Sequence, residues 1–292
     1  METDVKKGER KSLENLIERY RKGAVVPFIG AGFSMAVCPG WGNFLADFFD
    51  SEKDHTLLND DIAAFEQLEE GDDVGRFEVM AQLLSDGAET LRFKQAIETA
   101  FHRLDEESRR QIQSKFQLLN RVFPALKVTT NFDCLIEENH NGHVEVIRDN
   151  FENKLDTLFN PSSTNKLVKI HGCVTEPATL VLNTEQYDNA YGDTSAIDEK
   201  KIIPNLLLNL FKTRNVLFIG CSLQADRWLK LLDRREGVAD LFAIYKRETD
   251  PDEQKKLTQH LSRHMIHPIW IDDFPEIENI LRTLSPSGPE EE

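Results

Sequence analysis

The chain has 292 residues, of which 40% are hydrophobic, and a net charge of −16 at pH 7. This length is enough to bury the core of one large domain, or of one domain with an insertion. The negative charge disfavours nonspecific binding to nucleic acid or to an anionic membrane. No apolar run approaches the roughly 20 residues of a membrane-spanning helix, and the polar start lacks the apolar segment of a signal peptide. We therefore expect a cytoplasmic protein that contacts neither a membrane nor nucleic acid directly.

The first third of the chain predicts one βα unit followed by helices. Residues 12–22 have an apolar stripe at helical spacing behind Ser12, which is a good N-cap. The apolar run 25–30 predicts a buried strand, and a further helix is expected from about Trp41. Residues 57–123 then contain several amphipathic segments and no convincing strand, so we expect a helical subdomain inserted after the first βα unit.

From Ala125 onward, strand and helix patterns alternate, which is typical of a mostly parallel sheet covered on both faces. We therefore predict an α/β fold with a Rossmann-like core at about 12–56 and 124–285, within a single domain of residues 1–286. The acidic tail, residues 287–292, is expected to be disordered. The expected strands are 125–132, 143–147, 167–172, 215–222, 240–246 and 265–271, and the expected helices are 133–139, 202–214, 225–236, 252–264 and 274–284.

The cysteines bear on metal binding. Cys38, Cys134, Cys173 and Cys221 are far apart in the sequence, so the paired C-x-x-C spacing of a zinc site is absent. In a reducing compartment we expect four free thiols, mostly buried, and no metal centre.

The turn from Gly30 to Ser34 has two possible explanations. Glycines at 30 and 32 let a ligand approach the backbone closely, and a helix starting here would present free N–H groups to a phosphate. However, Met35 stands where the dinucleotide-binding fingerprint has its third glycine. Taken alone, the glycine pattern is a weak signal and favours an ordinary tight turn required by the fold.

Three further groups of unusual residues follow predicted strands: Thr130–Asp133, His171-Gly172 and Gly220–Ser222. Singly, each has a structural explanation, because Asn131 can cap a helix, Asp133 can compensate a helix dipole and His171 can be a buried structural histidine. The carboxyl ends of parallel strands, however, meet at one edge of a sheet, where ligands bind. The coincidence of all four groups at this edge favours a ligand-binding crevice.

These motifs, Gly30-Ala-Gly-Phe-Ser34, Thr130-Asn-Phe-Asp133, His171-Gly172 and Gly220-Cys-Ser-Leu223, occur in the order of the sirtuin fold. Over residues 12–285 the chain resembles the sirtuin-like proteins of bacterial anti-phage defence more closely than it resembles protein deacetylases.

The resemblance implies an NAD+ site with assigned roles. The Gly30–Ser34 turn would hold the pyrophosphate, and Asn131 would contact the nicotinamide ribose and position a water molecule. His171 would be the general base, so Asn131 and His171 are the expected catalytic residues. Phe33 would lie near the ribose, Asp133 near the nicotinamide amide, and the 220–223 segment near the phosphates and the adenosine ribose. The residues expected to bind NAD+ are Gly30, Ala31, Gly32, Phe33, Ser34, Asn131, Asp133, Gly220, Ser222 and Leu223.

The departures from deacetylases affect the expected reaction. The four-cysteine zinc module is missing, and we find no equivalent of the peptide-pairing segment after His171-Gly172. Water is therefore the expected acceptor, with NAD+ as substrate rather than cofactor and with nicotinamide and ADP-ribose as products. The alternatives are an NAD-dependent protein deacylase, a nonenzymatic module that binds NAD or ADP-ribose, and an α/β domain of unrelated role.

The resemblance also implies a biological role, which is NAD+ depletion in an infected cell. Such an enzyme must be silent in a healthy cell, and the sequence offers no room for a separate sensor domain. We therefore expect control by homo-oligomerisation or by a partner protein, with a HerA-type ATPase favoured over a short Argonaute.

Overall fold

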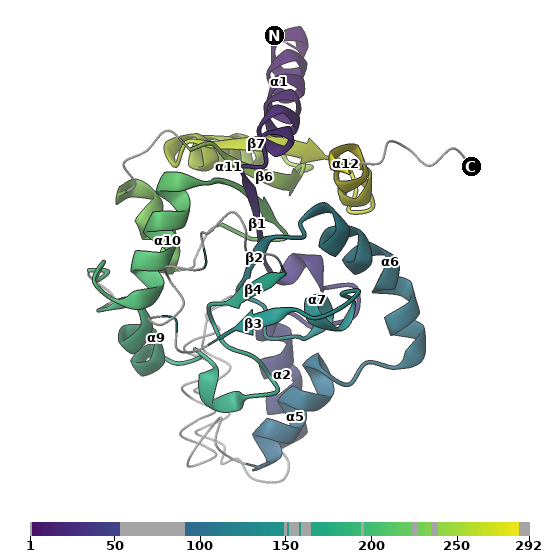
Figure 1. Ribbon diagram of the computed structural model, residues 1–292, viewed down its shortest axis with the longest axis vertical. Coiled ribbons are helices and arrows are strands. Elements are labelled where there is room, and N and C mark those ends of the chain that lie inside the picture. The colour runs from purple at the N-terminus through teal and green to yellow at the C-terminus, as the bar shows by residue number, and fades with distance from the viewer. Residues whose placement is uncertain are drawn as a thin grey trace.

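A seven-stranded parallel sheet forms the centre of the molecule, with the strand order β3-β4-β2-β1-β5-β6-β7 (Figure 1). Every neighbouring pair in this order is parallel. The strands are β1 (Val25–Ile29), β2 (Leu126–Thr129), β3 (Glu145–Ile147), β4 (Lys166–Lys169), β5 (Asn215–Ile219), β6 (Leu241–Lys246) and β7 (Ile266–Ile271). The computed structural model describes residues 2–52, 91–148, 151, 158, 165–193, 196–223, 227–234 and 239–285.

Helices cover both faces of the sheet. In β5, Val216 and Phe218 pack into one apolar cluster, whereas Leu217 and Ile219 pack into another on the opposite face. Because successive strand side chains alternate between faces, all four residues from Val216 to Ile219 are apolar. The helices are α1 (Glu2–Arg21), α2 (Trp41–Glu52), α5 (Leu91–Phe101), α6 (Glu106–Val122), α7 (Leu135–Glu138), α9 (Thr184–Tyr191), α10 (Ile202–Thr213), α11 (Pro251–Arg263) and α12 (Glu276–Leu284), with 3₁₀ turns η1 (Ala31–Phe33), η4 (Pro177–Thr179) and η5 (Arg227–Arg234).

The two apolar clusters define the layers on either side of the sheet. One cluster holds buried side chains of α2, α5, α6 and α12, and the other holds those of α10, η5 and α11. In Figure 1, α9 and α10 accordingly lie on one side of the strands and α5 and α6 on the other. The α/β fold with a Rossmann-like parallel sheet, predicted from the sequence, is confirmed.

Helices α5 and α6 belong to the segment that the sequence predicts to be a helical insertion. Phe93 and Phe101 of α5 and Phe116 of α6 are buried in the same cluster as Ile29 of β1. The ring of Phe116 meets that of Phe33 edge to face, with centroids 5.0 Å apart. These two helices therefore share one core with the sheet. The predicted helices within 57–90 and the predicted acidic tail lie outside the described residues.

Two elements differ from expectation. The segment expected to be an α-helix over 225–236 forms a 3₁₀ helix at Arg227–Arg234. Helix α9 was not expected, although Asn183 and Gln186 form a complete capping box at its start. In the part of the chain that is described, no helix combines the length and apolar character needed to cross a bilayer.

The sheet topology places the candidate site. From the central β1, the chain first builds one half of the sheet with β2, β3 and β4 and then crosses to β5 on the other side of β1. Strand order therefore reverses at β1, flanked by β2 and β5. In open α/β sheets, ligands bind beyond the carboxyl ends of the strands at such a switch point.

Candidate active site

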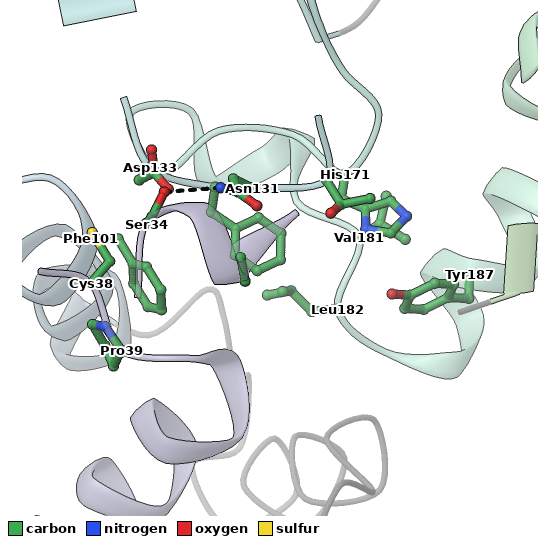
Figure 2. Close-up of a pocket in the computed structure, with 13 residues that line it drawn as sticks. Ser34, Cys38, Pro39, Phe101, Asn131, Asp133, His171, Val181, Leu182 and Tyr187 are labelled. Atoms are coloured by element: carbon green, nitrogen blue, oxygen red, sulfur yellow. Dashed lines mark hydrogen bonds between the residues drawn. The ribbon is translucent and has the colours of Figure 1, made fainter. Parts of the chain in front are cut away.

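A cavity of about 180 Å³ lies beyond the carboxyl ends of β1, β2 and β4 (Figure 2). It brings together five of the residues expected from the sequence: Ala31, Ser34, Asn131, Asp133 and His171. Its other walls are mostly apolar. They are formed by Cys38, Pro39, Phe101, Thr130, Phe132, Val181, Leu182 and Tyr187.

Asn131 is fixed at both its backbone and its side chain. Its backbone N–H donates to the Thr129 hydroxyl at 3.0 Å, and its side-chain amide donates to the Ser34 hydroxyl, also at 3.0 Å (Figure 2). The side chain therefore does not cap the following helix. Its Oδ1 atom is buried and accepts no hydrogen bond within the described part of the chain. A buried acceptor without a donor is costly, so this atom is positioned to accept from a ligand or from bound water.

Asp133, rather than Asn131, binds a backbone N–H at the start of the helix that follows β2. Its carboxylate accepts the backbone N–H of Leu135 at 3.0 Å, in the first turn of α7. A negative charge at a helix N-terminus is favourable because it meets the positive end of the helix dipole. Asp133 therefore lines the cavity while also stabilising the start of α7.

His171 follows β4 and is 3% exposed. Its Nε2 atom lies 2.8 Å from the hydroxyl of Tyr191, which is fully buried on α9. The rings of Tyr187 and Tyr191 contact the imidazole edge to face, with centroids at 5.4 and 5.9 Å. Two tyrosines of α9 thus fix the orientation of the imidazole ring. Sequence reasoning missed both, and the capping-box residues Asn183 and Gln186 were the signal that could have revealed α9.

The Gly30–Ser34 turn packs closely against the end of β5. Gly30 donates its N–H to the Ile219 carbonyl and Gly32 donates to the Gly220 carbonyl, each at 2.9 Å. The N–H groups of Phe33 and Ser34 are also used, because they donate to the carbonyls of Gly30 and Ala31. The glycines therefore have a packing role in the fold. That the turn holds a phosphate stays a prediction, for which Ala31, exposed and on the cavity wall, is the best-placed residue.

The remaining predicted ligand residues do not line this cavity. The ring of Phe33 is fully buried against Phe116, with the Lys115 ammonium 4.2 Å from its centroid.

Leu223 has a positive φ of 53°, but its side chain is buried in the core. Its carbonyl accepts from His260 Nε2 at 2.6 Å, and the Ser222 carbonyl accepts from the Tyr245 hydroxyl.

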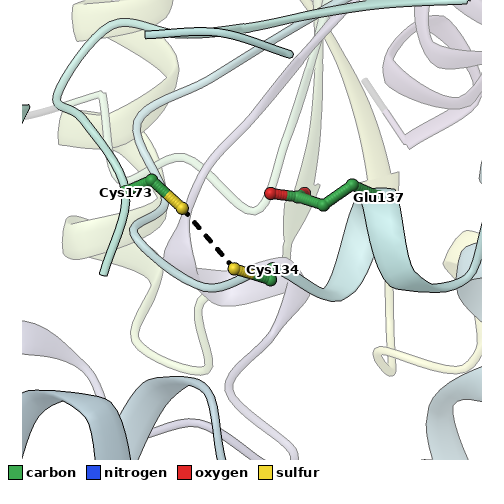
Figure 3. A group of neighbouring side chains, drawn as sticks. All are labelled: Cys134, Glu137 and Cys173. Carbon is green, nitrogen blue, oxygen red and sulfur yellow. Dashed lines mark hydrogen bonds between the residues drawn. The ribbon is translucent and has the colours of Figure 1, made fainter. Parts of the chain in front are cut away.

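Two cysteines that are far apart in the sequence meet beside the site. The Sγ atoms of Cys134 and Cys173 lie 3.5 Å apart (Figure 3). With a carboxylate oxygen of Glu137 they form three potential metal-binding atoms within 4.8 Å of one another. The buried Lys169 ammonium, however, already donates to Glu137 at 3.1 Å, and a cation here repels a metal ion. We assign no metal to this cluster.

The fold and the cavity define a Rossmann-like α/β protein with a polar ligand site at its topological switch point. Residues 125–266 match the model of the SIR2-like domain, so the sirtuin resemblance is supported for the three motifs within this segment, and that of the Gly30–Ser34 turn stays a prediction. The matched segment contains Asn131, Asp133 and His171.

Among known proteins, the chain is similar to the NAD(+) hydrolase ThsA of Enterococcus faecium. The two are 24% identical over 313 residues, which cover 93% of this chain and 57% of ThsA. The chain therefore spans little more than half the length of this relative.

The Gly30–Ser34 turn packs closely against the end of β5, which predicts that Gly220→Ala will be far more destabilising than Gly23→Ala. Both glycines have φ near +70°, so alanine is strained at either position, at a cost of about 1–2 kcal/mol. A Cβ at Gly220 would also lie 2.3 Å from the Phe33 nitrogen, whereas one at Gly23 would meet no atom within 4 Å. Overpacking adds about 1–3 kcal/mol. Urea unfolding of both variants measures the difference, and equal losses would contradict the packing role.

The contact between Tyr191 and His171 predicts a specific effect of Tyr191→Phe. The change retains the ring but removes the hydroxyl, so the free energy of unfolding should fall by about 1 kcal/mol. The nitrogen NMR signals of the His171 imidazole should also shift, because Nε2 loses its partner. Tyr187→Phe is the matched control, since the hydrogen bond between His171 and Tyr191 remains. Unchanged His171 signals in Tyr191→Phe would show that the hydroxyl does not orient the imidazole.

Proposed function

We propose that this chain is an NAD+ hydrolase that cleaves NAD+ to nicotinamide and ADP-ribose. The observation that carries the proposal is the unpaired Oδ1 atom of Asn131, buried in the same cavity as His171 at the switch point of the sheet. The similarity to a SIR2-like domain and to an NAD(+) hydrolase supports the same activity.

The reaction matches what these two side chains can do. As the bond between ribose C1′ and the nicotinamide nitrogen breaks, positive charge develops on the ribose, and nicotinamide leaves as a neutral molecule. Little acid catalysis is needed, whereas a held ribose, a positioned water molecule and a base are needed. Asn131 Oδ1 accepts a hydrogen bond from a ribose hydroxyl or from the attacking water, and His171 takes the proton that the water loses as its oxygen bonds to C1′.

The surrounding residues hold these two groups in place. Ser34 fixes the Asn131 amide, so that Oδ1 is the atom offered to substrate. Tyr191 and Tyr187 fix the imidazole ring. The apolar walls formed by Phe101, Phe132 and Leu182 suit the nicotinamide ring, with Asp133 close to its amide. The rest of the dinucleotide would run past Ala31.

The segment after His171 favours water over a peptide as the acceptor. Gly172 has a φ of +85°, and a Cβ there would lie 2.2 Å from the Thr179 carbonyl oxygen. The chain folds back through η4, and the Val181 N–H donates to the His171 carbonyl at 3.1 Å. This segment closes one wall of the cavity with Val181 and Leu182. The second candidate, a protein deacylase, would need a free edge here to pair with its peptide.

We propose further that the reaction needs no metal, because the leaving group is already stabilised and Lys169 disfavours a cation at the cysteine cluster. Activity should therefore survive exhaustive chelation. For the cell, the resemblance to defence proteins supports NAD+ depletion in the cytoplasm of an infected bacterium. Control would come from homo-oligomerisation or a partner chain, with a HerA-type ATPase favoured over a short Argonaute.

The proposal predicts that His171→Ala lowers the rate of NAD+ cleavage by about 10²–10⁴-fold in a folded protein, since a positioned base is lost. Asn131→Ala should also lose turnover while costing only about 1 kcal/mol of stability. His267→Ala, on β7 at the edge of the sheet, should retain the parental rate. Products are resolved by chromatography, with and without candidate partners.

Three outcomes of this assay would count against the proposal. A folded His171→Ala variant with near-parental cleavage would remove His171 from the mechanism. Formation of O-acetyl-ADP-ribose with an acetylated peptide would identify a deacylase. Tight NAD+ binding without cleavage under every condition would favour the nonenzymatic module.

A further inference from the structure

A pair of neighbouring thiols lies between the two loops that carry Asn131 and His171. Cys134 lies on the loop between β2 and α7, three residues after Asn131, and Cys173 lies two residues after His171 on the loop that follows β4. Their Sγ atoms are 3.5 Å apart (Figure 3). The two loops already run side by side, because the Val174 N–H donates to the Phe132 carbonyl at 3.1 Å.

The surroundings of the pair favour a thiolate at Cys173. The hydrogen bond with Cys134 and then the Lys169 ammonium lower the pKa of Cys173, although burial opposes them. The same hydrogen bond and burial raise the pKa of Cys134. Burial would lower the pKa of Lys169, but Glu137 and the neighbouring acidic groups hold it above its usual value. A thiolate beside a lysine ammonium and a second thiol is the arrangement of a redox-active pair.

The other two cysteines lack these features. Burial raises the pKa of Cys38 to about 12, and the nearby carboxylates of Asp133 and Glu138 add to this effect. Cys221 lies against the backbone carbonyls of Phe28 and Ile219. Neither has a second thiol within hydrogen-bond distance among the described residues. They therefore serve as internal references for the reactivity of the pair.

We propose that Cys134 and Cys173 form a disulfide when the protein meets a small oxidant of the hydrogen peroxide class. The Cys173 thiolate attacks one peroxide oxygen, the O–O bond breaks, and a sulfenic acid and hydroxide form. The Cys134 sulfur then attacks the sulfenic sulfur, the S–S bond forms and water leaves. The hydroxide takes up the proton that Cys173 released on becoming a thiolate, so in sum two thiols and one peroxide give one disulfide and two waters. Both thiols are buried, so a water-sized oxidant reaches them more readily than glutathione disulfide does.

The disulfide between Cys134 and Cys173 should slow NAD+ cleavage, an expectation that rests on the proposed function. A disulfide brings the two sulfurs from 3.5 Å to roughly 2.05 Å and ties the two loops covalently. The new constraint acts within three residues of Asn131 and His171. A displacement of about 1 Å can cost a hundredfold in rate. We expect oxidation to slow NAD+ cleavage by tenfold or more, and a thiol reductant to restore it.

The test begins with the unmodified protein treated with hydrogen peroxide. Intact mass should fall by two hydrogen atoms, and non-reducing proteolysis should release one peptide that joins Cys134 to Cys173, while Cys38 and Cys221 remain alkylatable. Glutathione disulfide should give the same peptide more slowly. Zinc is measured in the same untreated sample.

Several results would overturn the proposal. These are the absence of the joined peptide, stepwise oxygen addition at separate cysteines, or stoichiometric zinc that protects both thiols, which would identify a metal site instead. Cys173→Ser and Cys134→Ser should each lose the peptide and any effect of peroxide on the NAD+ cleavage rate. The joined peptide is detected by mass and does not depend on activity. A reduced protein that does not cleave NAD+ would therefore contradict the proposed function, whereas the peptide alone would still show whether the disulfide forms.

Discussion

The whole site depends on the close backbone contact between the turn after β1 and the turn after β5. Gly32 donates to the Gly220 carbonyl, and an added Cβ at Gly30, Gly32 or Gly220 would come within 3.0 Å of the facing turn. This contact lets the two halves of the sheet meet tightly at the switch point. It also places Ser34 where it can hold Asn131, so the strand pairing and the polar site are consequences of one constraint.

Within that frame, the chain buries polar groups and satisfies most of their hydrogen bonds. Tyr191 satisfies one nitrogen of His171, and Asp133 binds the start of α7. Lys169 is buried with its ammonium on the Asp133 carbonyl and the Glu137 carboxylate. Two of these residues keep a buried oxygen without a partner among the described residues, Asn131 at Oδ1 and Glu137 at Oε2, and of the two only Asn131 lines the cavity. Its position on the cavity wall makes the unpaired Asn131 acceptor meaningful, because a buried polar atom without a partner is tolerated where a ligand supplies one.

Sequence patterns predict the sheet well because a strand buried on both faces is apolar throughout, as at Val216–Ile219. Convergence of Asn131 and His171 followed from parallel topology alone. Other features arise from tertiary contacts that no local pattern contains. Examples are the buried Lys127 inside β2, the pairing of Cys134 with Cys173 across 39 residues, and the packing of the glycine turn. Helix α9 is different, because its capping box was visible in the sequence.

The central claim is that Asn131 and His171 share a site for the nicotinamide ribose of NAD+. The most direct measurement is a crystal structure of His171→Ala soaked with NAD+, so that the dinucleotide is not consumed. We expect intact NAD+ with its nicotinamide ribose in the cavity and a hydroxyl or ordered water donating to Asn131 Oδ1. NAD+ bound elsewhere, or an empty cavity at saturating NAD+ with Oδ1 still unpaired, would contradict it.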